Sequence, residues 1–432
     1  MSADYLVSPG GALRGHLRVP GDKSISHRAV ILGAIAEGES RVRGFLRGAD
    51  ALATVEAFRR MGVVIEEPAP GELRIHGVGL HGLRRPDVPL DLGNSGTAMR
   101  LLAGLLAGQD WASELTGDES LLQRPMARIT GPLAEMGARI ETAGGTAPLR
   151  ISPAPMRGIH YQMPVASAQV KSCLLLAGLY AGGETCVTEL APTRDHTERM
   201  LAGFGCDVRR RPGQACVTGG ARLHGGELEV PADISSAAFF LLGASISAGS
   251  DLLLEHVGIN PTRTGILNIL DAMGARIELL NRRDAGGEPV ADLRVRSAKL
   301  KGIEIPETQV PLAIDEFPAI AVAAACAEGE TVIRGAGELR VKESDRIAAI
   351  IAGLRNLGVS VEEYADGMRI RGGAIAGGSV DSRGDHRIAM AFSMAALAAG
   401  EAVGILDCRN VATSFPGFVE LAAVAGLRIQ DA

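Results

Sequence analysis

The chain has 432 residues, of which 46% are hydrophobic and 22% are charged, and its formal net charge is -6. This length and apolar content argue against a disordered chain and predict more than one domain. Acidic residues outnumber Lys and Arg by 50 to 44 and only 3% of residues are aromatic, so we expect neither a nucleic-acid-binding nor a membrane protein.

Cysteine usage and the N-terminal segment predict the compartment. The six cysteines, at positions 173, 186, 206, 216, 326 and 408, form no C-x-x-C pair, and we expect them to be reduced, buried and hydrophobic in role. The first residues lack the basic and apolar regions of a signal peptide. The apolar stretch 388–406 is expected to form a buried helix, a turn and a strand rather than a membrane span. We therefore expect a cytoplasmic protein.

One pattern recurs six times along the chain: an apolar helical run ends at a glycine, and an alternating strand follows. The glycines stand at positions 62, 137, 205, 274, 358 and 426, with spacings of 75, 68, 69, 84 and 68 residues. Glycine suits the left-handed position that ends a helix, so each one predicts a helix followed by a strand. The sequence thus predicts six α+β units, three in each of two lobes, with a boundary near residue 237.

A second series of polar turns precedes helices rich in small residues. Ser, Asn and Asp are the residues that cap helix N-termini, and the positive ends of helix dipoles favour anions. If these helix starts converge, we expect a cleft that binds a multiply charged anion. The turns occupy residues 21–28, 93–100, 167–171, 233–236, 315–318 and 385–387.

The first two turns contain candidate ligands for such an anion. Lys23, Ser24 and Arg28 share one turn and the helix start that follows it, and they can converge on one phosphate or carboxylate; a solvated loop is the alternative. The glycines of 93–100 allow a close backbone approach, with Asn94 as a donor, although the spacing fits neither a Walker A loop nor a dinucleotide fingerprint. An ordinary capped turn is the alternative there.

The later turns add further cations and two carboxylates. Taken singly, each has a plain explanation, such as a surface arginine, a charged helix start or an N-cap at Asp315. Together they suit anionic substrates with an acid and a base to move protons. No activated Ser or Cys nucleophile is apparent, and His27, His196 and His386 lack the spacing of a zinc site. The full set is Lys23, Arg28, Arg124, Arg194, Lys342, Arg346 and Arg387, with Asp315 and Glu343.

At these residues the chain resembles the 5-enolpyruvylshikimate-3-phosphate synthase family along its whole length. The matching strings are residues 20–28, 92–100, 340–346 and 385–387. The resemblance implies an α/β (α+β), two-lobed enolpyruvyl transferase fold of six βαβαββ repeats. It also implies that the first strand returns to the second lobe. The expected lobes are therefore residues 21–236 and residues 1–20 plus 237–432, with the active site in the cleft between them.

The resemblance further implies the transfer of an enolpyruvyl group from phosphoenolpyruvate to the 5-hydroxyl of shikimate-3-phosphate, on the pathway to chorismate and the aromatic amino acids. By this analogy Asp315 accepts the hydroxyl proton, Glu343 protonates the methylene carbon and Lys23 assists. A tetrahedral ketal then loses phosphate. We expect no metal and no organic cofactor, and we expect a monomer whose partners are the two small substrates, without nucleic acid or membrane.

Two overlapping sets of ligands are implied in the same way. The shikimate-3-phosphate ligands are Lys23, Ser24, Arg28, Ser167, Ala168, Gln169, Arg194, Asp315 and Lys342. The phosphoenolpyruvate ligands are Lys23, Asn94, Gly96, Arg124, Gln169, Arg346 and Arg387.

Three strings, residues 167–171, 194–198 and 260–263, resemble the second class of the family, which is often tolerant of glyphosate. Position 96 is nevertheless Gly, where a tolerant member can carry Ala, and Thr413 stands where the first class has Lys. Glyphosate sensitivity therefore stays open.

Two alternatives remain at this stage. The sister enolpyruvyl transferase that acts on UDP-N-acetylglucosamine uses a loop cysteine, and residues 108–126 contain none. A non-catalytic anion-binding repeat protein would need the cations but neither Asp315 nor Glu343.

Overall fold

The computed structural model describes residues 4–432, and the chain divides in it into two compact units. Unit 1 comprises residues 4–20, 231–284 and 289–432, and unit 2 comprises residues 21–230 and 285–288. The chain changes unit at Pro231, whereas the expected boundary after residue 236 falls inside helix α7 (Ile234–Ile246). Each unit has its own hydrophobic core.

Unit 2 contains three four-stranded sheets, in which neighbouring strands are hydrogen-bonded. The first is β14 (Glu227–Glu229), β3 (Glu37–Arg43), β5 (Glu72–Val78) and β4 (Val64–Ala69); the second is β6 (Leu90–Asp91), β7 (Ser113–Thr116), β9 (Thr146–Ser152) and β8 (Arg139–Ala143); the third is β10 (His160–Gln162), β11 (Glu184–Thr188), β13 (Gln214–Thr218) and β12 (Arg209–Arg211).

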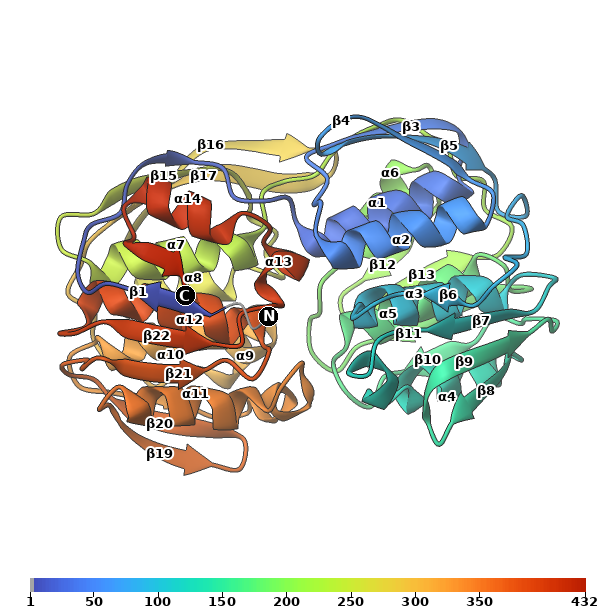
Figure 1. Ribbon diagram of the computed structural model, residues 1–432. Helices are drawn as coiled ribbons and strands as arrows, with labels where there is room; N and C mark the ends of the chain where they lie inside the picture. The colour runs from blue at the N-terminus through green and yellow to red at the C-terminus, as the bar shows by residue number, and fades with distance from the viewer. Residues whose placement is uncertain (1–3) are drawn as a thin grey trace. The chain divides into compact units, whose positions relative to one another are not determined.

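Unit 1 also contains three sheets, and two of them include strands from the start of the chain. Figure 1 shows the N-terminal strand β1 beside β22, near the other end of the chain. The sheets are β16 (Arg276–Ala285), β17 (Glu288–Arg296), β15 (Asp251–Gly258) and β2 (Arg14–Leu17); β18 (Glu330–Ile333), β20 (Gly367–Arg371) and β19 (Ser360–Tyr364); and β21 (Gly378–Asp381), β22 (Val403–Leu406), β1 (Tyr5–Val7) and β23 (Ile429–Asp431).

The six sheets repeat one pairing pattern. Five of them combine one parallel pair with antiparallel pairing, and the parallel pairs are β14–β3, β6–β7, β10–β11, β21–β22 and β2–β15. The three-stranded sheet gains its parallel neighbour as an isolated bridge between Glu304 and Val332. The predicted fold of six repeated α/β units is therefore confirmed.

Helices accompany every sheet. In unit 2 they are α1 (Lys23–Ile35), α2 (Ala49–Arg60), α3 (Gly96–Ala107), α4 (Ala127–Glu135), α5 (Ala168–Gly178) and α6 (His196–Gly203), with the 3-10 turn η1 (Leu121–Gln123). In unit 1 they are α7, α8 (Gly265–Ala272), α9 (Val310–Ala313), α10 (Phe317–Ala325), α11 (Arg346–Asn356), α12 (His386–Ala395), α13 (Val411–Ser414) and α14 (Phe418–Ala425), with η2 (Glu307–Gln309), η3 (Gly337–Val341) and η4 (Ala396–Ala398).

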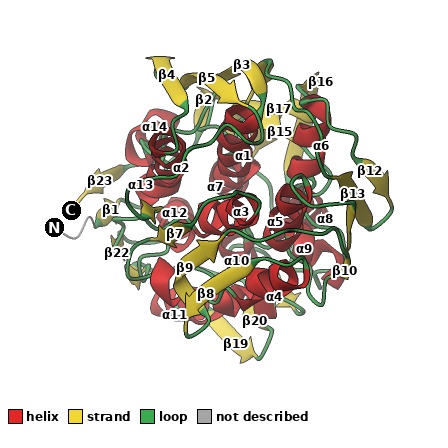
Figure 2. Ribbon diagram, turned by 90° about the vertical axis from the view of Figure 1, so that its right-hand side faces the viewer, coloured by secondary structure: helices red, strands yellow, loops and turns green. Residues whose placement is uncertain are grey.

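In each unit the helices that follow the polar turns lie inside. Figures 1 and 2 show β3, β4 and β5 covering one side of α1 and α2. Helix α7 is buried from Ile234 to Ser245, as expected for a helix that is apolar all round. Segment 388–406 forms most of α12, then η4 and β22, as predicted. Among the described residues, no helix combines the length and apolar character that a membrane crossing requires.

The six glycines that define the repeat occupy the positions predicted for them. Each has a positive φ, between 80° and 115°. A side chain at such a φ is strained, whereas glycine is not. These glycines end helices that pack against the sheets, and the next strand begins two to four residues later. The repeating glycines of the sequence thus mark the end of one helix in each of the six units.

The expectation of six reduced cysteines is wrong for one pair. Cys186 and Cys216 are partners in the antiparallel register of β11 and β13, and they form a disulfide with a Cα–Cα distance of 4.1 Å. Their separation of 30 residues gave no sign of this register. The other four cysteines are free. Burial raises the pKa of the Cys173 and Cys326 thiols to about 12.

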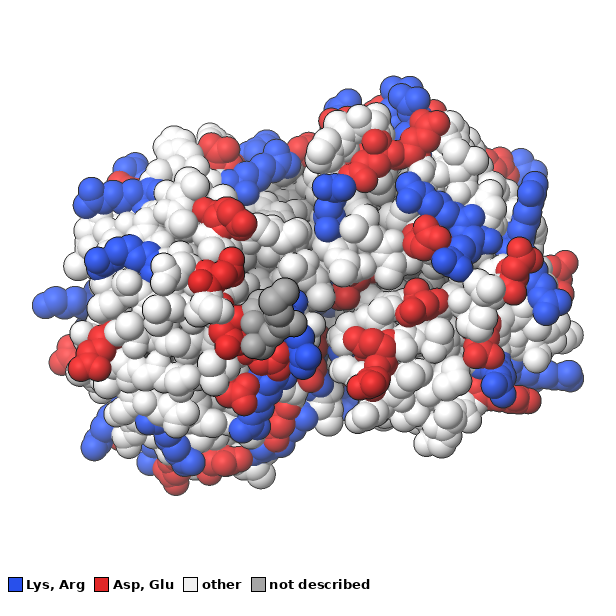
Figure 3. Space-filling model, in the orientation of Figure 1, with Lys and Arg blue, Asp and Glu red and all other residues white. Residues whose placement is uncertain are grey.

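Surface charge is mixed in sign on the face drawn in Figure 3. Lys and Arg lie among Asp and Glu there, with uncharged surface between them. This pattern agrees with the nearly balanced charge of the sequence.

Candidate active site

In unit 2 the start of α1 presents the first predicted cation. The Asp22 side chain caps the helix by accepting a hydrogen bond from the Ile25 amide at 2.8 Å. Lys23, the first helical residue, forms an ion pair with Asp50 of α2, with 2.8 Å between Nζ and Oδ2. Both side chains are largely buried. The ammonium group is thereby held at a helix N-terminus, where an anionic ligand is favoured.

The start of α3 gathers three predicted ligands. Ser95 caps the helix, and the Asn94 amide oxygen accepts a hydrogen bond from Arg124 Nη2 at 2.5 Å. A Cβ placed on Gly96 would lie 3.0 Å from Arg124 Nη1 and 2.9 Å from Arg100 Nη1. The glycine therefore allows two guanidinium groups to approach the helix N-terminus together.

Helix α5 joins this cluster. The Ser167 hydroxyl caps α5 and Ala168 is its first residue. The side chain of Gln169 accepts a hydrogen bond from Arg100 at 2.8 Å and donates one to Thr97 of α3 at 3.0 Å. The first turns of α3 and α5 are thus tied side by side.

Arg28 and Arg194 complete the predicted cations of unit 2. Arg28 is 4% exposed and hydrogen-bonds Ser172 of α5 and Thr197 of α6. Burial lowers the pKa of Arg28 to about 10, and the like charge of Arg194 acts in the same direction. Arg28 therefore stays cationic at neutral pH. The structure therefore brings the predicted residues of this unit to the starts of α1, α3, α5 and α6.

His27 lies behind this surface as an uncharged connector. Its ring accepts or donates at 2.8 Å to Thr54 and at 3.4 Å to Ser95, so it links α1, α2 and the cap of α3. Burial lowers the pKa of His27 to about 3. The interpretation of His27 as a structural histidine fits these contacts.

The lowered pKa of His27 predicts a pH-dependent stability. Below about pH 6.5 the unfolded chain binds a proton on His27 that the native state does not bind. The free energy of unfolding therefore decreases as the pH is lowered, until the folded pKa near 3 is reached. We expect the free energy of unfolding of wild type, relative to His27→Gln, to fall by roughly 3 kcal/mol between about pH 7.5 and 4.5. Urea unfolding of both proteins at several pH values measures this difference. A difference independent of pH would contradict the assignment.

In unit 1 a fully buried arginine organises the predicted residues. Arg346 is the first residue of α11 and is 0% exposed. Its guanidinium contacts Asp385 at 2.8 Å, Glu343 at 2.6 Å and Asp315 at 3.4 Å. Burial alone would lower the pKa of Arg346, but Asp385, Glu343 and Asp315 outweigh it and raise the pKa. A buried charge requires partners of this kind.

Asp315 lies at the centre of this group. One of its carboxylate oxygens is 3.8 Å from Lys342 Nζ and 3.4 Å from Arg346, and the other is 3.7 Å from Arg387. Asp315 lies just before the N-terminus of α10, but the N-cap residue of that helix is Glu316. A simple N-cap role therefore does not account for Asp315. Three cations therefore meet three carboxylates, Asp315, Glu343 and Asp385, within unit 1.

Several partners of the predicted residues escaped the sequence analysis. Asp50 binds Lys23, Arg100 binds Gln169, and Asp385 binds Arg346. Positions 100 and 385 belonged to recognised turns, whereas position 50 did not. His196, considered only as a zinc ligand, has its Nδ1 2.7 Å from Glu288, 92 residues further along. No local spacing signals contacts of this range.

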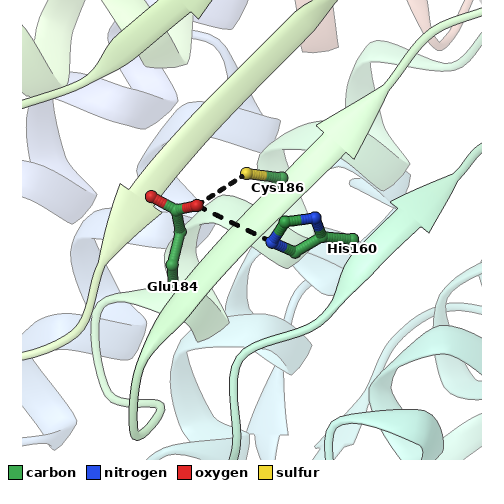
Figure 4. Close-up of side chains that lie close together, drawn as sticks. All are labelled: His160, Glu184 and Cys186. Carbon is green, nitrogen blue, oxygen red and sulfur yellow. Dashed lines mark hydrogen bonds and ion pairs between the residues drawn. The ribbon is translucent and has the colours of Figure 1, made fainter.

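One cluster outside these groups has the residue types of a metal site. Figure 4 shows His160 and Glu184 approaching each other beside Cys186 on neighbouring strands. The three candidate ligand atoms lie within 4.8 Å of one another. However, the sulfur of Cys186 belongs to the disulfide, and Arg209 pairs with Glu184. Because a thiolate, not a disulfide sulfur, ligates metals, this cluster does not provide a metal site in the oxidised state.

Comparison with known proteins decides between the remaining alternatives. The model of the EPSP synthase (3-phosphoshikimate 1-carboxyvinyltransferase) family matches residues 7–421. The 3-phosphoshikimate 1-carboxyvinyltransferase of Alkalilimnicola ehrlichii is 67% identical over 99% of this chain and 96% of its own length. That of Methylococcus capsulatus is 65% identical over 99% of this chain and 98% of its own length. The chain belongs to the EPSP synthase family.

The solved structures agree with this assignment. EPSP synthase from Acinetobacter baumannii matches with a TM-score of 0.91 at 54% identity, and the match covers 100% of both chains. Membership in the family makes this protein an enzyme that transfers an enolpyruvyl group in the shikimate pathway. The binding-protein alternative and the UDP-N-acetylglucosamine alternative are thereby set aside.

Proposed function

We propose that the residue groups of both units serve one reaction. In it, the 1-carboxyvinyl group of phosphoenolpyruvate passes to the 5-hydroxyl of shikimate-3-phosphate and phosphate is released. The observation that carries the proposal is the position of Asp315 among Lys342, Arg346 and Arg387. Such a group offers positive charge for anionic substrates and a carboxylate for proton transfer in one place.

Shikimate-3-phosphate is assigned mainly to the helix starts of unit 2. Helix N-termini and buried arginines are suited to a phosphate because their N–H groups point to the anion. Asp315 and Lys342 of unit 1 are assigned to the acceptor as well. The residues from unit 2 are Lys23, Ser24, Arg28, Ser167, Ala168, Gln169 and Arg194.

Phosphoenolpyruvate carries a phosphate and a carboxylate, and cations of both units are assigned to it. In unit 2 the assignment is supported by the cluster of Arg124, Asn94, Gln169 and Gly96 at the starts of α3 and α5. Lys23, which is assigned to the acceptor, is assigned to phosphoenolpyruvate as well. In unit 1 Arg346 and Arg387 are assigned. Their charges would stabilise the negative charge that is retained throughout the reaction.

The chemistry requires three proton transfers. The 5-hydroxyl oxygen bonds to C2 of phosphoenolpyruvate while Asp315 accepts the hydroxyl proton, and Glu343 donates a proton to C3. The resulting tetrahedral ketal then returns a proton from C3 to the Glu343 carboxylate as the bond between C2 and the phosphate oxygen breaks. Lys23 assists these transfers, and phosphate leaves with the bonding pair. The balance is one enolpyruvyl ether and one phosphate for each pair of substrates.

The Arg346–Glu343 contact suggests how Glu343 becomes a proton donor. Without ligand, Glu343 pairs with Arg346 at 2.6 Å. A substrate carboxylate bound to Arg346 would compete with Glu343 for that guanidinium. Glu343 would then be released to act on the substrate that it protonates.

Acceptor choice tests the proposal. Purified protein is incubated without added metal, with phosphoenolpyruvate and either shikimate-3-phosphate or UDP-N-acetylglucosamine, and phosphate is measured. We expect release only with shikimate-3-phosphate. Release with the nucleotide sugar, or silence with both from folded protein, would overturn the assignment. We further propose that the protein is a cytoplasmic monomer that binds no nucleic acid. Sedimentation of the pure protein measures its assembly, and sedimentation with added DNA measures nucleic-acid binding.

Gly96→Ala is expected to weaken the use of phosphoenolpyruvate. The added Cβ would press on Arg100 and Arg124, so both guanidinium groups must shift. We expect KM for phosphoenolpyruvate to rise roughly tenfold, the size of a one-methyl discrimination. Steady-state phosphate release measures KM, and a glyphosate inhibition curve in the same series tests Gly96 as a determinant of tolerance.

Gly131→Ala is the matched control, because Gly131 lies in α4 and a Cβ there meets no atom within 4 Å. Equal KM values for wild type and both variants would remove Gly96 from the proposed site.

A further inference from the structure

Arg28 is held by contacts that the reaction as proposed does not use. Its Nε donates to the Thr197 hydroxyl at 2.7 Å and its Nη2 donates to the Ser172 hydroxyl at 2.7 Å. Its Nη1 donates to the Ser24 carbonyl at 2.8 Å. The Thr197 hydroxyl in turn donates to Ser172 at 2.7 Å. One guanidinium is thus fixed by three groups from α1, α5 and α6.

This arrangement uses only part of the hydrogen-bonding capacity of Arg28. A guanidinium has five N–H groups, of which one is on Nε and two are on each terminal nitrogen. The three contacts occupy one N–H on each nitrogen. One N–H on Nη1 and one on Nη2 remain, and two N–H groups of one guanidinium can bind a phosphate or carboxylate bidentately.

The hydroxyl groups of Ser172 and Thr197, which accept hydrogen bonds from Arg28, are buried. Ser172 is 0% exposed and Thr197 is 1% exposed. Neither can exchange its arginine contact for water without opening the packing of α1 against α5 and α6. A hydroxyl can rotate its hydrogen and so accept from Arg28 while donating elsewhere. The pair therefore restricts the rotamer of a long, flexible side chain before any ligand arrives.

Buried charges next to the two hydroxyl groups balance Arg28. Lys171 adjoins Ser172 and contacts two carboxylates, Glu189 and Glu198, the second at 2.7 Å. Two carboxylates and one ammonium leave one surplus negative charge, and Arg28 supplies the opposite charge. Although burial lowers the pKa of Arg28, the charge of Glu198 raises it. The arginine is therefore both oriented and kept cationic by residues on the same two helices.

We propose that Thr197 and Ser172 are positioning residues of the acceptor site, which hold Arg28 so that its two remaining N–H groups bind the anionic acceptor substrate. This inference rests on the proposed function, which assigns Arg28 to shikimate-3-phosphate. It adds to that assignment two residues that would influence which acceptor the site binds. The two hydroxyl groups determine the orientation of the guanidinium and thus which acceptor anion fits.

The test uses Thr197→Val, which keeps the shape of the side chain and removes the hydroxyl, and Thr197→Ser, which keeps the hydroxyl. KM for each substrate and kcat are measured, and calorimetry measures the Kd of shikimate-3-phosphate. We expect Thr197→Val to raise the KM and Kd of shikimate-3-phosphate by roughly 10–100-fold, the range of one hydrogen bond to a charged group. The KM of phosphoenolpyruvate should change far less, and Thr197→Ser should restore near-wild-type values.

Thr185→Val is the matched control. Thr185 is 0% exposed in the same unit, and its hydroxyl has no hydrogen-bond partner. We expect its KM values to equal those of wild type.

The outcomes separate this inference from the proposed function. If wild type releases phosphate with shikimate-3-phosphate but Thr197→Val has an unchanged Kd for it, only the positioning role is overturned. A fall in thermal midpoint with unchanged Kd would likewise assign Thr197 a purely structural role. If wild type neither binds nor uses shikimate-3-phosphate, the proposed function fails first. Ser172→Ala is the second variant, should Thr197→Val not fold.

Discussion

Asp315→Asn is expected to lower kcat roughly 10²–10⁴-fold, the contribution of a general base. The amide has the shape of the carboxylate but cannot accept the hydroxyl proton. It also removes the negative charge that faces Lys342, Arg346 and Arg387. Steady-state phosphate release at saturating substrates measures kcat, so weakened binding does not enter the comparison.

Asp251→Asn provides a matched control for that variant. Asp251 also pairs with arginines, Arg294 at 2.7 Å and Arg296 at 3.9 Å, but it does so on the exposed surface of β15. Its kcat is expected to remain close to that of wild type. Asp315→Asn with a kcat within about twofold of wild type would exclude general-base catalysis by this residue, because a general base contributes at least roughly 10²-fold.

Arg346→Met is expected to destabilise unit 1 by about 3–5 kcal/mol and to abolish activity. The substitution leaves Asp385, which is 0% exposed, as a buried carboxylate without its main cation, and breaking a buried ion pair from one side costs about this much. Urea unfolding measures the stability, and phosphate release measures the activity.

The double variant Arg346→Met/Asp385→Asn separates the two effects. Asparagine removes the charge but can still cap α12, where Asp385 accepts a hydrogen bond from the Arg387 amide at 2.9 Å. We expect most of the lost stability to return while activity stays absent, because the arginine assigned to phosphoenolpyruvate is still missing. Equal stability of the single and double variants would contradict the view that Asp385 is the charge that Arg346 neutralises.

The period of the sequence predicted the fold because each unit repeats the same local requirements. A glycine ends one helix and an Asp or Ser caps another, as at Gly62 and Asp22, and both are local choices of the backbone. The disulfide between Cys186 and Cys216 was missed because it depends on the register of β11 and β13, which no local pattern encodes.

In the candidate site, too, residues in local patterns could be predicted from the sequence, whereas their distant partners could not. Lys23, Arg346 and Asp315 lie in recognisable turns, so the sequence marked them. Their partners lie elsewhere in the chain: Asp50 on a second helix and Asp385 39 residues from Arg346. Tertiary packing alone selects such partners, and packing is not visible in spacing.

Phosphate release by wild type, Lys23→Met and Asp315→Asn, with both substrates present, tests most directly whether the two units serve one reaction. Lys23 belongs to unit 2 and Asp315 to unit 1. We expect one phosphate per enolpyruvyl ether formed by wild type, and a loss of activity of at least roughly 10²-fold in each variant. Undiminished release by either folded variant would contradict this expectation, because that residue would then take no part in the proton transfers assigned to it.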